Sequence, residues 1–519
     1  MKPTGAFAPL VAALALWLGL ASPVAAETVL RARLNADILS LDPGARRDEN
    51  TDAVILHLVE GLVASREDGS VGPMLASGWT VSPDGRTYTF ALRQGVTFHN
   101  GAPLTSAEVV WSLKRYLDPK TRWRCRFEFG DEGITQIESI LAPDPRTVVV
   151  RLSKPAPMFL KTLARGDCGG TGIMHPDSVG PDGAIRRLIG TGPFEVSSWK
   201  RNQFIELARF ARYASLPGPR DGNTGGKRAL VDKVRFLVIP DGSAARAALL
   251  RGNLDVLDAL SPTELAGVRG KKGVRLEINP TMDLYTVLFQ TKDPVIGDAR
   301  LRRAIALSID TAGLAKAVTW DTAKGNNSPV PRVSPFYGPV QAAPRRVDIA
   351  EARRLAKAAG YRGQPIRLVT NRRYPQCFDA AVLIQAMAAQ AGINIQIDTL
   401  DWATQLDRYT TGEYQAMVEP FSARLDPSLS FGVLIGDKAK DPRKAWSTPR
   451  ARELLKRSMQ AEGQADRQAA FDDLQRAFME DTPAIALFSS SRIAAVRQNV
   501  TGYKGWPAAQ QRLWGVGLR

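Results

Sequence analysis

The sequence contains few cysteines, histidines and aromatic residues. Three cysteines and three histidines among 519 residues argue against a zinc-rich protein and against a framework of disulfides. Aromatic residues make up 7% of the chain and charged residues 23%, while hydrophobic residues make up 44%. These values are typical of globular proteins and exclude a disordered, collagenous or polytopic membrane chain. At roughly 150 residues per domain, the length predicts two to four domains.

Familiar catalytic motifs are also missing. The sequence has no H-E-x-x-H, C-x-x-C or G-x-S-x-G pattern. Gly222–Arg228 resembles a phosphate-binding loop, but its glycines are one residue too close and arginine replaces the residue that binds magnesium. The histidines lie in different segments without metal-binding spacing, so we expect turn or helix-surface positions for His57, His99 and His175. The sequence therefore predicts no enzyme, no cofactor and no metal site.

Residues 1–26 have the features of a secretory signal peptide. Lys2 supplies the positive charge, Leu10–Leu20 the short apolar stretch, and Val24–Ala26 a small-residue cleavage site. The alternative is an uncleaved membrane anchor, but the apolar stretch is well below the roughly 20 residues that a span needs. No later segment is apolar enough to cross a bilayer. We therefore expect a soluble protein that is exported to the periplasm.

The formal net charge of +17 raises the question of an anionic partner. Such a balance suits nucleic acid, an anionic membrane surface or anionic ligands. The basic residues are scattered in pairs, whereas nucleic-acid-binding proteins concentrate them on one arm or helix face with aromatic residues between them. We expect no nucleic-acid partner. A basic envelope protein that binds nucleic acid or another anionic polymer remains the alternative from a different functional class.

Strand and helix patterns are mixed along the chain, which is typical of α/β proteins. Period-2 alternation of apolar residues predicts strands at Thr87–Leu92, Thr147–Leu152, Val234–Ile239 and Ile393–Ile397. Helical patterns, each with a start or stop signal, cover Ser106–Tyr116 (with Ser106 as the N-cap), Ile349–Ala359 and Ala381–Ala391. The most loop-like stretch, Pro217–Gly226, is expected to be an exposed excursion.

One stretch, Leu75–Pro119, closely resembles the most diagnostic segment of the family 5 substrate-binding proteins of ATP-binding-cassette importers. Its specific parts are Gly78–Trp79, Ser82–Gly85, Leu92–Arg93, Phe98–Gly101 and the helix that follows. Other segments are similar to the same family in the same order, namely Leu41–Pro43, Glu60–Leu62, Gly190–Phe194, Asp298–Asp310, Ala350–Tyr361 and Gly392–Trp402. Most of these motifs also have a structural explanation as turns and bends, so we do not expect them to contact a ligand.

The resemblance implies an α/β fold with two lobes joined by a hinge and an accessory domain in the first lobe. On this sequence the first lobe would take residues 27–60, 190–279 and 491–519, the accessory domain 61–189 and the second lobe 280–490. Cys125 and Cys168 then fall in one domain and could form a disulfide in an oxidising periplasm, which would leave Cys377 free. Their spacing does not establish the bond.

The resemblance also suggests where a ligand would bind. In the dipeptide-binding members, a second-lobe arginine holds the ligand carboxylate, and an aspartate shortly before an Asp-Pro pair holds its ammonium group. Here Asn371 takes the place of that arginine, and Arg372 and Arg373 are displaced by one or two positions. The ammonium-binding acid is missing, because Ala423 or Arg424 stands in its place. A guanidinium there would repel an ammonium group and attract a carboxylate or phosphate.

We therefore predict substrate contacts from five residues in the second lobe, Arg372, Arg373, Trp402, Phe421 and Arg424. Each has an alternative explanation. Adjacent strand residues point to opposite faces, so at most one of the first two arginines would face the ligand. The two aromatic residues could belong to the core, and Asp426–Pro427 could simply start a helix.

The predicted function is that of a periplasmic substrate-binding component of an ATP-binding-cassette importer. Its ligand would be a peptide or a peptide-like solute, including anionic and opine-like solutes, and its partner the membrane permease. We expect a monomer. A nickel chelate is the second candidate ligand within the family, although none of the three histidines falls in the predicted second-lobe cleft.

Overall fold

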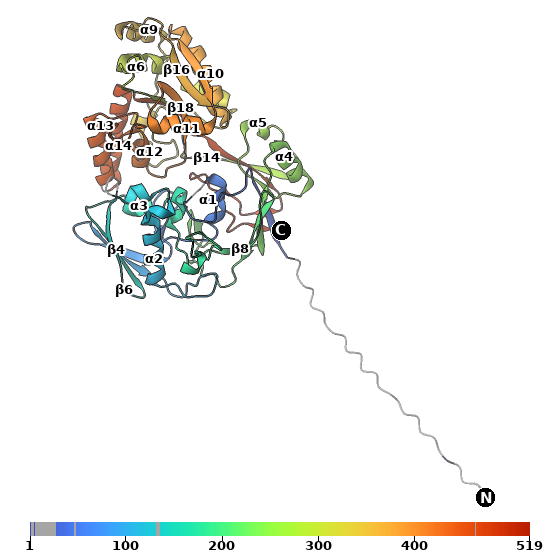
Figure 1. Ribbon diagram of the computed structural model, residues 1–519. Helices are drawn as coiled ribbons and strands as arrows, with labels where there is room; N and C mark the ends of the chain where they lie inside the picture. The colour runs from blue at the N-terminus through green and yellow to red at the C-terminus, as the bar shows by residue number, and fades with distance from the viewer. Residues whose placement is uncertain (2–4, 6–26, 46–47, 131–134, 462) are drawn as a thin grey trace.

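Three β-sheets with helices packed against them organise the chain (Figure 1). The computed structural model describes residues 1, 5, 27–45, 48–130, 135–461 and 463–519. The predicted signal peptide thus lies outside the described residues, apart from Met1 and Gly5. Within the described part of the chain, no helix has the length and apolar character needed to cross a bilayer.

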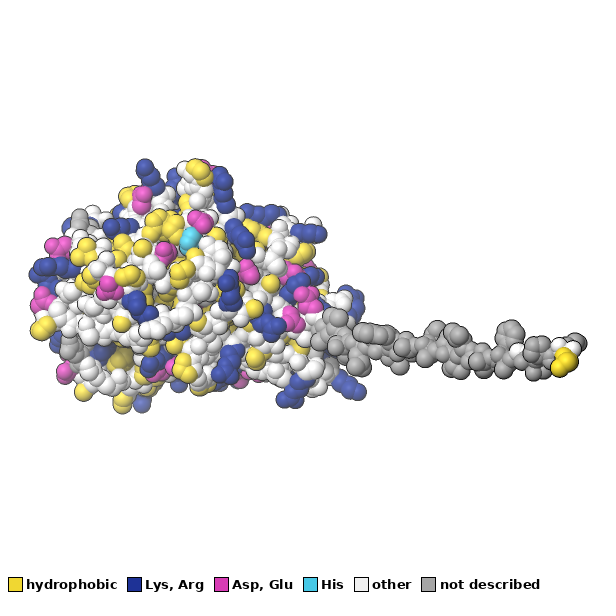
Figure 2. Space-filling model, turned by 90° about the horizontal axis from the view of Figure 1, so that it is seen from below, with side chains coloured by type: hydrophobic (Ala, Val, Ile, Leu, Met, Phe, Trp, Pro, Cys, Tyr) yellow, Lys and Arg dark blue, Asp and Glu magenta, His cyan; other side chains and the backbone are white. Residues whose placement is uncertain are grey.

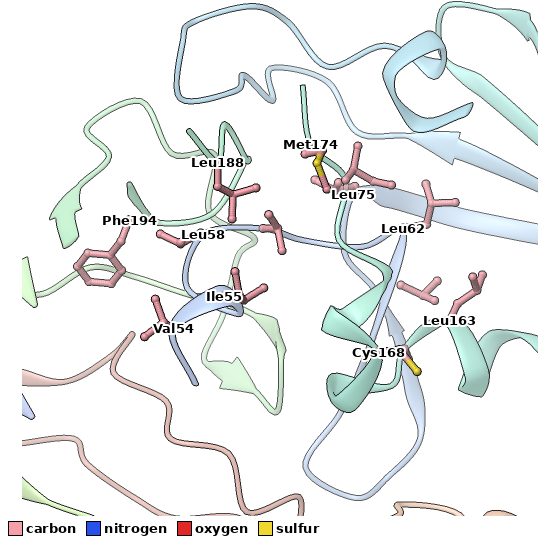
Figure 3. Packing of buried hydrophobic residues seen from close by; sticks show 14 of the residues in the cluster. Val54, Ile55, Leu58, Leu62, Leu75, Leu163, Cys168, Met174, Leu188 and Phe194 are labelled. Carbon is pink, nitrogen blue, oxygen red and sulfur yellow. The ribbon is translucent and has the colours of Figure 1, made fainter. Parts of the chain in front are cut away.

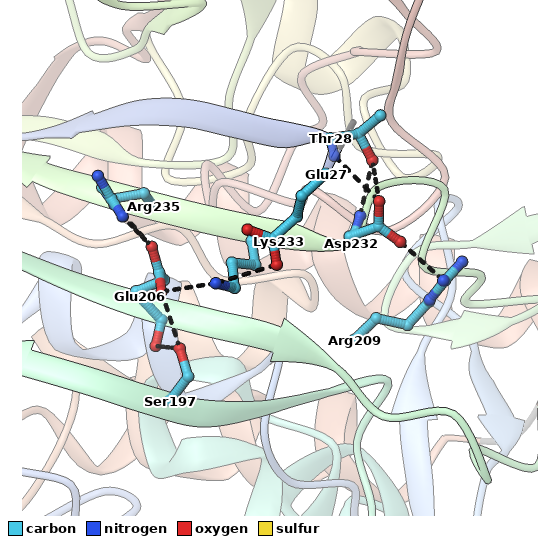
Figure 4. Close-up of polar contacts among 8 residues, drawn as sticks. All are labelled: Glu27, Thr28, Ser197, Glu206, Arg209, Asp232, Lys233 and Arg235. Carbon is cyan, nitrogen blue, oxygen red and sulfur yellow. Dashed lines mark hydrogen bonds and ion pairs between the residues drawn. The ribbon is translucent and has the colours of Figure 1, made fainter. Parts of the chain in front are cut away.

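The first lobe is built on a seven-stranded mixed sheet in which β1 is parallel to β12 and β13. The strands follow the order β14 (Val274–Pro280), β20 (Ser491–Arg497), β13 (Val256–Leu257), β1 (Val29–Leu34), β12 (Lys233–Val238), β9 (Phe204–Arg209) and β8 (Phe194–Lys200). Ion pairs connect neighbouring strands of this sheet. Glu206 on β9, for example, pairs with Arg235 and Lys233 on β12 (Figure 4). Helices α4 (Gly242–Arg251) and α5 (Pro262–Leu265) connect strands of this sheet.

The accessory domain contains a four-stranded antiparallel sheet with helix α2 (Ser106–Leu117) against it. The strand order is β4 (Ala76–Val81), β5 (Thr87–Leu92), β7 (Thr147–Leu152) and β6 (Ile137–Asp144), which confirms the strands predicted at β5 and β7. The predicted cap of α2 is wrong by one residue. Thr105 is the N-cap, because its hydroxyl accepts from the backbone of Ala107 and its own backbone N–H donates to Glu108 in a capping box.

The second lobe is built on a five-stranded sheet that is buried on both faces. Its order is β17 (Ile395–Leu400), β16 (Ile366–Asn371), β18 (Ala416–Phe421), β15 (Leu284–Phe289) and β19 (Ala484–Phe488). One face packs on α6 (Ala299–Ser308), α7 (Thr311–Val318), α9 (Ile349–Ala358) and α10 (Pro375–Gln390). The other packs on α11 (Trp402–Thr411), α12 (Pro427–Leu434), α13 (Pro449–Gln460) and α14 (Gln464–Asp481). All six β15 residues are buried, as expected for a strand covered on both sides.

Two predicted elements shift in position. The strand predicted at Ile393–Ile397 begins two residues later, at Ile395. Gly392 has φ +75°, and Ile393 and Asn394 form the connection between the end of α10 and the strand. Helix α10 begins at Pro375, six residues before the predicted start, because proline at the first helical position tolerates the missing N–H.

Two crossing segments connect the lobes. Residues 281–283 lead from β14 to β15, and residues 489–490 lead from β19 back to β20. The Asp283 carboxylate accepts from the backbone N–H of Ser490 at 2.6 Å, and Thr281 donates its backbone N–H to the Ser490 carbonyl at 3.0 Å. The two segments are thereby tied side by side. Each of the three sheets falls within one of the three predicted domains, apart from Pro280 at the end of β14; the exact domain boundaries remain a prediction.

The first lobe and the accessory domain share one hydrophobic core (Figure 3). It extends from Val54 and Leu58 on the first-lobe side to Leu163 and Cys168 on the accessory side. Cys125 and Cys168 form a disulfide within this core, with their Cα atoms 5.7 Å apart, and Cys377 is buried and free. The suggested pairing is therefore present in the structure.

The expected exposed excursion at Pro217–Gly226 is confirmed for Pro217–Pro219, which are exposed, and is wrong for the residues that follow. The segment forms a small hairpin of β10 (Arg220–Asp221) and β11 (Thr224–Gly225), and its tip is buried. Gly222 has φ +63°, and a Cβ atom there would lie 2.2 Å from the carbonyl oxygen of Ser65. Many turn residues signalled a loop correctly, but the tertiary structure uses these glycines for close contact with another segment.

Two of the three histidines, His57 and His99, lie in turns, which is one of the two expected positions, but both are buried. His57 is fully buried among Phe194, Phe236 and Trp514, and His99 is 7% exposed. The His57 Nδ1–H donates to the carbonyl of Ala53 at 2.6 Å, while Nε2 accepts from the backbone N–H of Leu513 at 2.9 Å. Both ring nitrogens are satisfied in the neutral form, which makes burial tolerable.

We predict that the fold loses stability on acidification because His57 is buried in its neutral form. Burial lowers the pKa of His57 to about 3, whereas in an unfolded chain a histidine titrates near 6.5. Between these values the unfolded state binds a proton that the folded state does not, so the free energy of unfolding falls as the pH decreases. Urea unfolding at pH 7, 6 and 5 should show this loss.

His57→Gln removes the titrating group, so its free energy of unfolding should fall less steeply with decreasing pH than that of the parent. We expect a slope difference of up to roughly 1.4 kcal/mol per pH unit. Equal slopes for the parent and the variant would contradict the assignment.

Candidate functional site

A small cavity of about 30 Å³ lies where the first lobe, the accessory domain and the second lobe meet in this structure. Helices α3 (Phe159–Leu163) and α12 face each other near this junction (Figure 1). The polar and aromatic side chains of the lining include Lys161, Arg165 and Asp167 from the accessory domain, Asn223, Trp506 and Gln510 from the first lobe, and Arg424 and Asp426 from the second lobe. The cavity thus exists only where all three parts of the fold come together.

Asp426 joins the accessory domain to the second lobe. It is the N-cap of α12, where its carboxylate accepts from the backbone N–H of Ser428 at 2.9 Å, and Pro427 follows at the first helical position. The same carboxylate pairs with Lys161 on α3 and, through both oxygens at 2.7–2.8 Å, with Arg467 on α14. Burial would raise the pKa of Asp426, but the two cations hold it below its usual value. The carboxylate is therefore ionised and bridges two domains.

Arg165 is saturated by its own neighbours. Its guanidinium makes two hydrogen bonds to Asp167, at 2.8 and 3.0 Å, and a further one to Glu128. Burial would lower the pKa of Arg165, but the two carboxylates raise it overall. Arg165 consequently has little capacity left for a ligand, although its charge affects the neighbouring Arg424.

Arg424 differs from the other cations of the cavity because no carboxylate of the described residues lies within 4 Å of it. Its Nη1 donates to the carbonyl oxygen of Ser422 at 2.8 Å, and its guanidinium lies 5.8 Å from the centre of the Phe421 ring. Burial and the nearby Arg165 lower the pKa of Arg424 to about 10, so it remains charged at neutral pH. An arginine in this state is a receptor for a carboxylate or phosphate group.

The five predicted contact residues separate into two groups. Phe421 and Arg424 lie at the end of β18, where Phe421 is 8% exposed and packs against Tyr409 in the second-lobe core. Arg424 is the member of the five that lines the cavity.

The remaining three lie at the end of β16 and the start of α11. Arg372 and Arg373 are exposed, and the Arg372 guanidinium lies 3.7 Å from the centre of the Phe378 ring. Trp402 is partly buried and contacts Tyr374 edge to face. None of these three lines the cavity. Asn371, which takes the place of the family's arginine, is buried and donates to Gln405 at 3.0 Å.

Sequence reasoning missed the cavity residues of the accessory domain and the first lobe. Lys161 and Asp167 come from a segment without a recognisable motif, and Asn223 comes from the hairpin that was expected to be exposed. The one feature of the sequence that could have drawn attention to the first of these segments was Cys168, because its disulfide holds the turn that carries Asp167. No group of histidine, cysteine and carboxylate side chains suited to a metal occurs among the residues that the structure describes.

Charge on the molecular surface is mixed. Figure 2 shows basic side chains scattered over one face with acidic ones among them, without a continuous basic stripe on that face. A binder of anionic polymers usually concentrates its basic residues. This face does not favour the polymer-binding alternative.

Comparison with known proteins places the chain among solute-binding proteins. Residues 70–441 match the middle region of the bacterial extracellular solute-binding proteins, family 5. The chain is 26% identical to the probable D,D-dipeptide-binding periplasmic protein DdpA of Escherichia coli K12, over 98% of each chain. It is 28% identical to the glutathione-binding protein GsiB of Salmonella typhi, over 74% of this chain and 73% of that protein.

Solved structures show the same architecture. The binding protein AgaA in complex with agropinic acid, from A. tumefaciens R10, is 25% identical and superimposes with a TM-score of 0.78 over 95% of this chain and 99% of that chain. NikA from Brucella suis in complex with Fe(III)-EDTA is 20% identical and has a TM-score of 0.82 over 95% of this chain and 100% of that chain. The two-lobed α/β fold expected from the sequence is confirmed.

We predict that the Lys161–Asp426 ion pair holds the accessory domain and the second lobe together. Lys161→Ala removes the cross-domain partner of Asp426, while Arg467 keeps that carboxylate paired within the second lobe. The empty variant should therefore be more open than the parent. Small-angle X-ray scattering should show a larger radius of gyration at an unchanged melting temperature.

Lys154→Ala supplies the control, because Lys154 is an exposed lysine of the same domain. It should scatter like the parent. A Lys161→Ala protein with the same scattering curve as the parent would show that the ion pair does not determine the interdomain geometry.

Proposed function

The chain belongs to family 5 of the bacterial extracellular solute-binding proteins, and we propose that it is the substrate-binding component of an ATP-binding-cassette importer. It would capture a peptide or a peptide-like, opine-like solute between its lobes and deliver it to a membrane permease. The relatives support this class of ligand, because their names specify a D,D-dipeptide and glutathione, and one related structure contains agropinic acid.

The observation that carries the proposal is the cavity at the three-domain junction, with Arg424 on its wall and no carboxylate of the described residues within 4 Å of that arginine. Arg424 is partly buried and lacks a carboxylate at this distance in the described part of the chain, so this wall favours a ligand with a carboxylate or phosphate group. The predicted contacts Arg372, Arg373, Trp402 and Phe421 remain proposals for parts of the ligand that extend beyond the cavity.

The mode of action that we propose is closure of two lobes about the tied crossing segments. A permease that prefers the closed state distinguishes loaded from empty protein without any chemical step. The mature protein would be a periplasmic monomer released by cleavage after residue 26. Its first lobe would comprise residues 27–60, 190–279 and 491–519, its accessory domain residues 61–189 and its second lobe residues 280–490. It would neither modify its ligand nor bind nucleic acid.

The test starts from protein purified without refolding, whose copurified ligand is identified by native mass spectrometry. Calorimetry then measures binding of glutathione, agropinic acid and a D,D-dipeptide, and scattering measures compaction on binding. Binding with compaction and without conversion of the solute is the expected result. Hydrolysis of the solute would contradict the non-enzymatic role, and steeply salt-dependent binding of an anionic polymer would favour the alternative.

We predict that Arg424→Ala weakens binding of an anionic solute about ten- to a hundredfold. A charge-assisted hydrogen bond to a desolvated arginine contributes roughly 1.5–3 kcal/mol, which corresponds to this range. Calorimetry of the parent and the variant with the same solute checks it. The melting temperature of the empty protein should change little, because no carboxylate of the described residues lies within 4 Å of Arg424.

Arg354→Ala is the matched control for this measurement. Arg354 is an exposed arginine on α9 that pairs with Glu351, and it does not line the cavity. The control should bind like the parent. Equal affinity of Arg424→Ala and the parent would contradict the proposed role of Arg424 and the preference for an anion.

A further inference from the structure

Two side-chain amides on the first-lobe wall of the cavity have an oxygen atom without a partner. Within the described part of the chain, Asn223 Oδ1 and Gln510 Oε1 are buried and accept no hydrogen bond. Most buried side-chain polar atoms in folded proteins have at least one partner, and an unpaired acceptor loses the hydrogen bonds that it had with water. Both residues line the same cavity as Arg424, so a molecule bound there can supply the missing donors.

Backbone hydrogen bonds fix the hairpin tip that carries Asn223. Asn223 lies between β10 and β11, and its N–H donates to the carbonyl of Ser65 at 2.8 Å. Next to it, the carbonyl of Gly222 accepts from Arg512 at 3.1 Å, and Arg512 also pairs with Glu67 at 2.7 Å. The hairpin tip is thereby fixed against two other segments, and Asn223 is 6% exposed. The backbone that carries its amide is therefore positioned before any ligand binds.

Gln510 and Trp506 complete this wall. The indole N–H of Trp506 donates to the backbone carbonyl of Gln510 at 3.1 Å. The guanidinium of Arg512, a buried residue, lies 4.3 Å from the centre of the Trp506 ring. Since its N–H is already used, Trp506 offers the cavity an apolar surface. The wall therefore combines two hydrogen-bonding amides with one aromatic ring.

We propose that Asn223 and Gln510 bind an amide group of the same solute whose anionic group binds Arg424. This rests on the proposed function and narrows its ligand class. A peptide unit carries an N–H donor and a carbonyl acceptor, and each side-chain amide can pair with both. The cargo is then a compact amide-bearing anion, such as an N-acylated amino acid or a short peptide with a blocked or acidic amino end.

The experiment compares two probes that differ in one atom. N-acetyl-alanine has its one amide N–H at the position where its ester analogue, O-acetyl-lactate, has an oxygen, and both have the same carboxylate. Calorimetry measures both probes on the parent, Asn223→Ala, Gln510→Ala, Arg424→Ala and the control Gln498→Ala. Gln498 is an exposed glutamine that does not line the cavity. Melting temperatures establish that each variant is folded, and Gln510, which is only partly buried, provides a test if Asn223→Ala fails to fold.

The parent should bind the amide about tenfold more tightly than the ester, since one hydrogen bond is lost. This ratio should fall towards one in Asn223→Ala or Gln510→Ala and stay unchanged in Gln498→Ala. Arg424→Ala should weaken both probes equally and keep the ratio.

Equal binding of amide and ester by the parent would overturn the inference, as would a ratio that survives both alanine substitutions. The inference also fails if the parent binds neither probe but binds agropinic acid or another solute, and the proposed function survives that result. Failure of the parent to bind or copurify with any solute would overturn the proposed function together with the inference.

Discussion

The buried carboxylate of Asp426 makes the interaction that joins the accessory domain to the second lobe beside the cavity. It caps α12, pairs with Arg467 inside the second lobe and pairs with Lys161 on the accessory domain. A buried carboxylate is stable only when its charge is compensated, so the loop that carries it is tied to both cations. Arg424 lies two residues earlier on that loop and is therefore brought to the cavity.

The presence or absence of a carboxylate partner distinguishes the cations that stabilise the fold from Arg424, the cation proposed to bind a ligand. Buried Lys227 lies 3.6 Å from Glu60 and 4.5 Å from the centre of the Trp514 ring, and Arg165 is held by two carboxylates. Arg424 has no such partner among the described residues. Lys227 and Arg165 are thus paired with carboxylates within the chain, whereas Arg424 lines the cavity without a carboxylate of the described residues within 4 Å.

The connection between the lobes suits this role. Asp283 ties the two crossing segments through Ser489 and Ser490, so the lobes are joined at a narrow place while each keeps its own core. A bend at this place changes few buried contacts within either lobe. In the mode of action that we propose, movement about this place opens or closes the cavity, because the cavity walls come from both sides.

The sequence by itself determined the features that depend on residues close to one another along the chain. Alternation at Thr87–Leu92 and Thr147–Leu152 predicted two strands with correct ends, and Asp426–Pro427 could be recognised as the start of a helix. Only the tertiary structure decided the partners of distant segments. Local periodicity reports which face of an element is buried, but not which segment covers it, and so Asn223 and Lys161 could not be placed beside Arg424, nor His57 in the core.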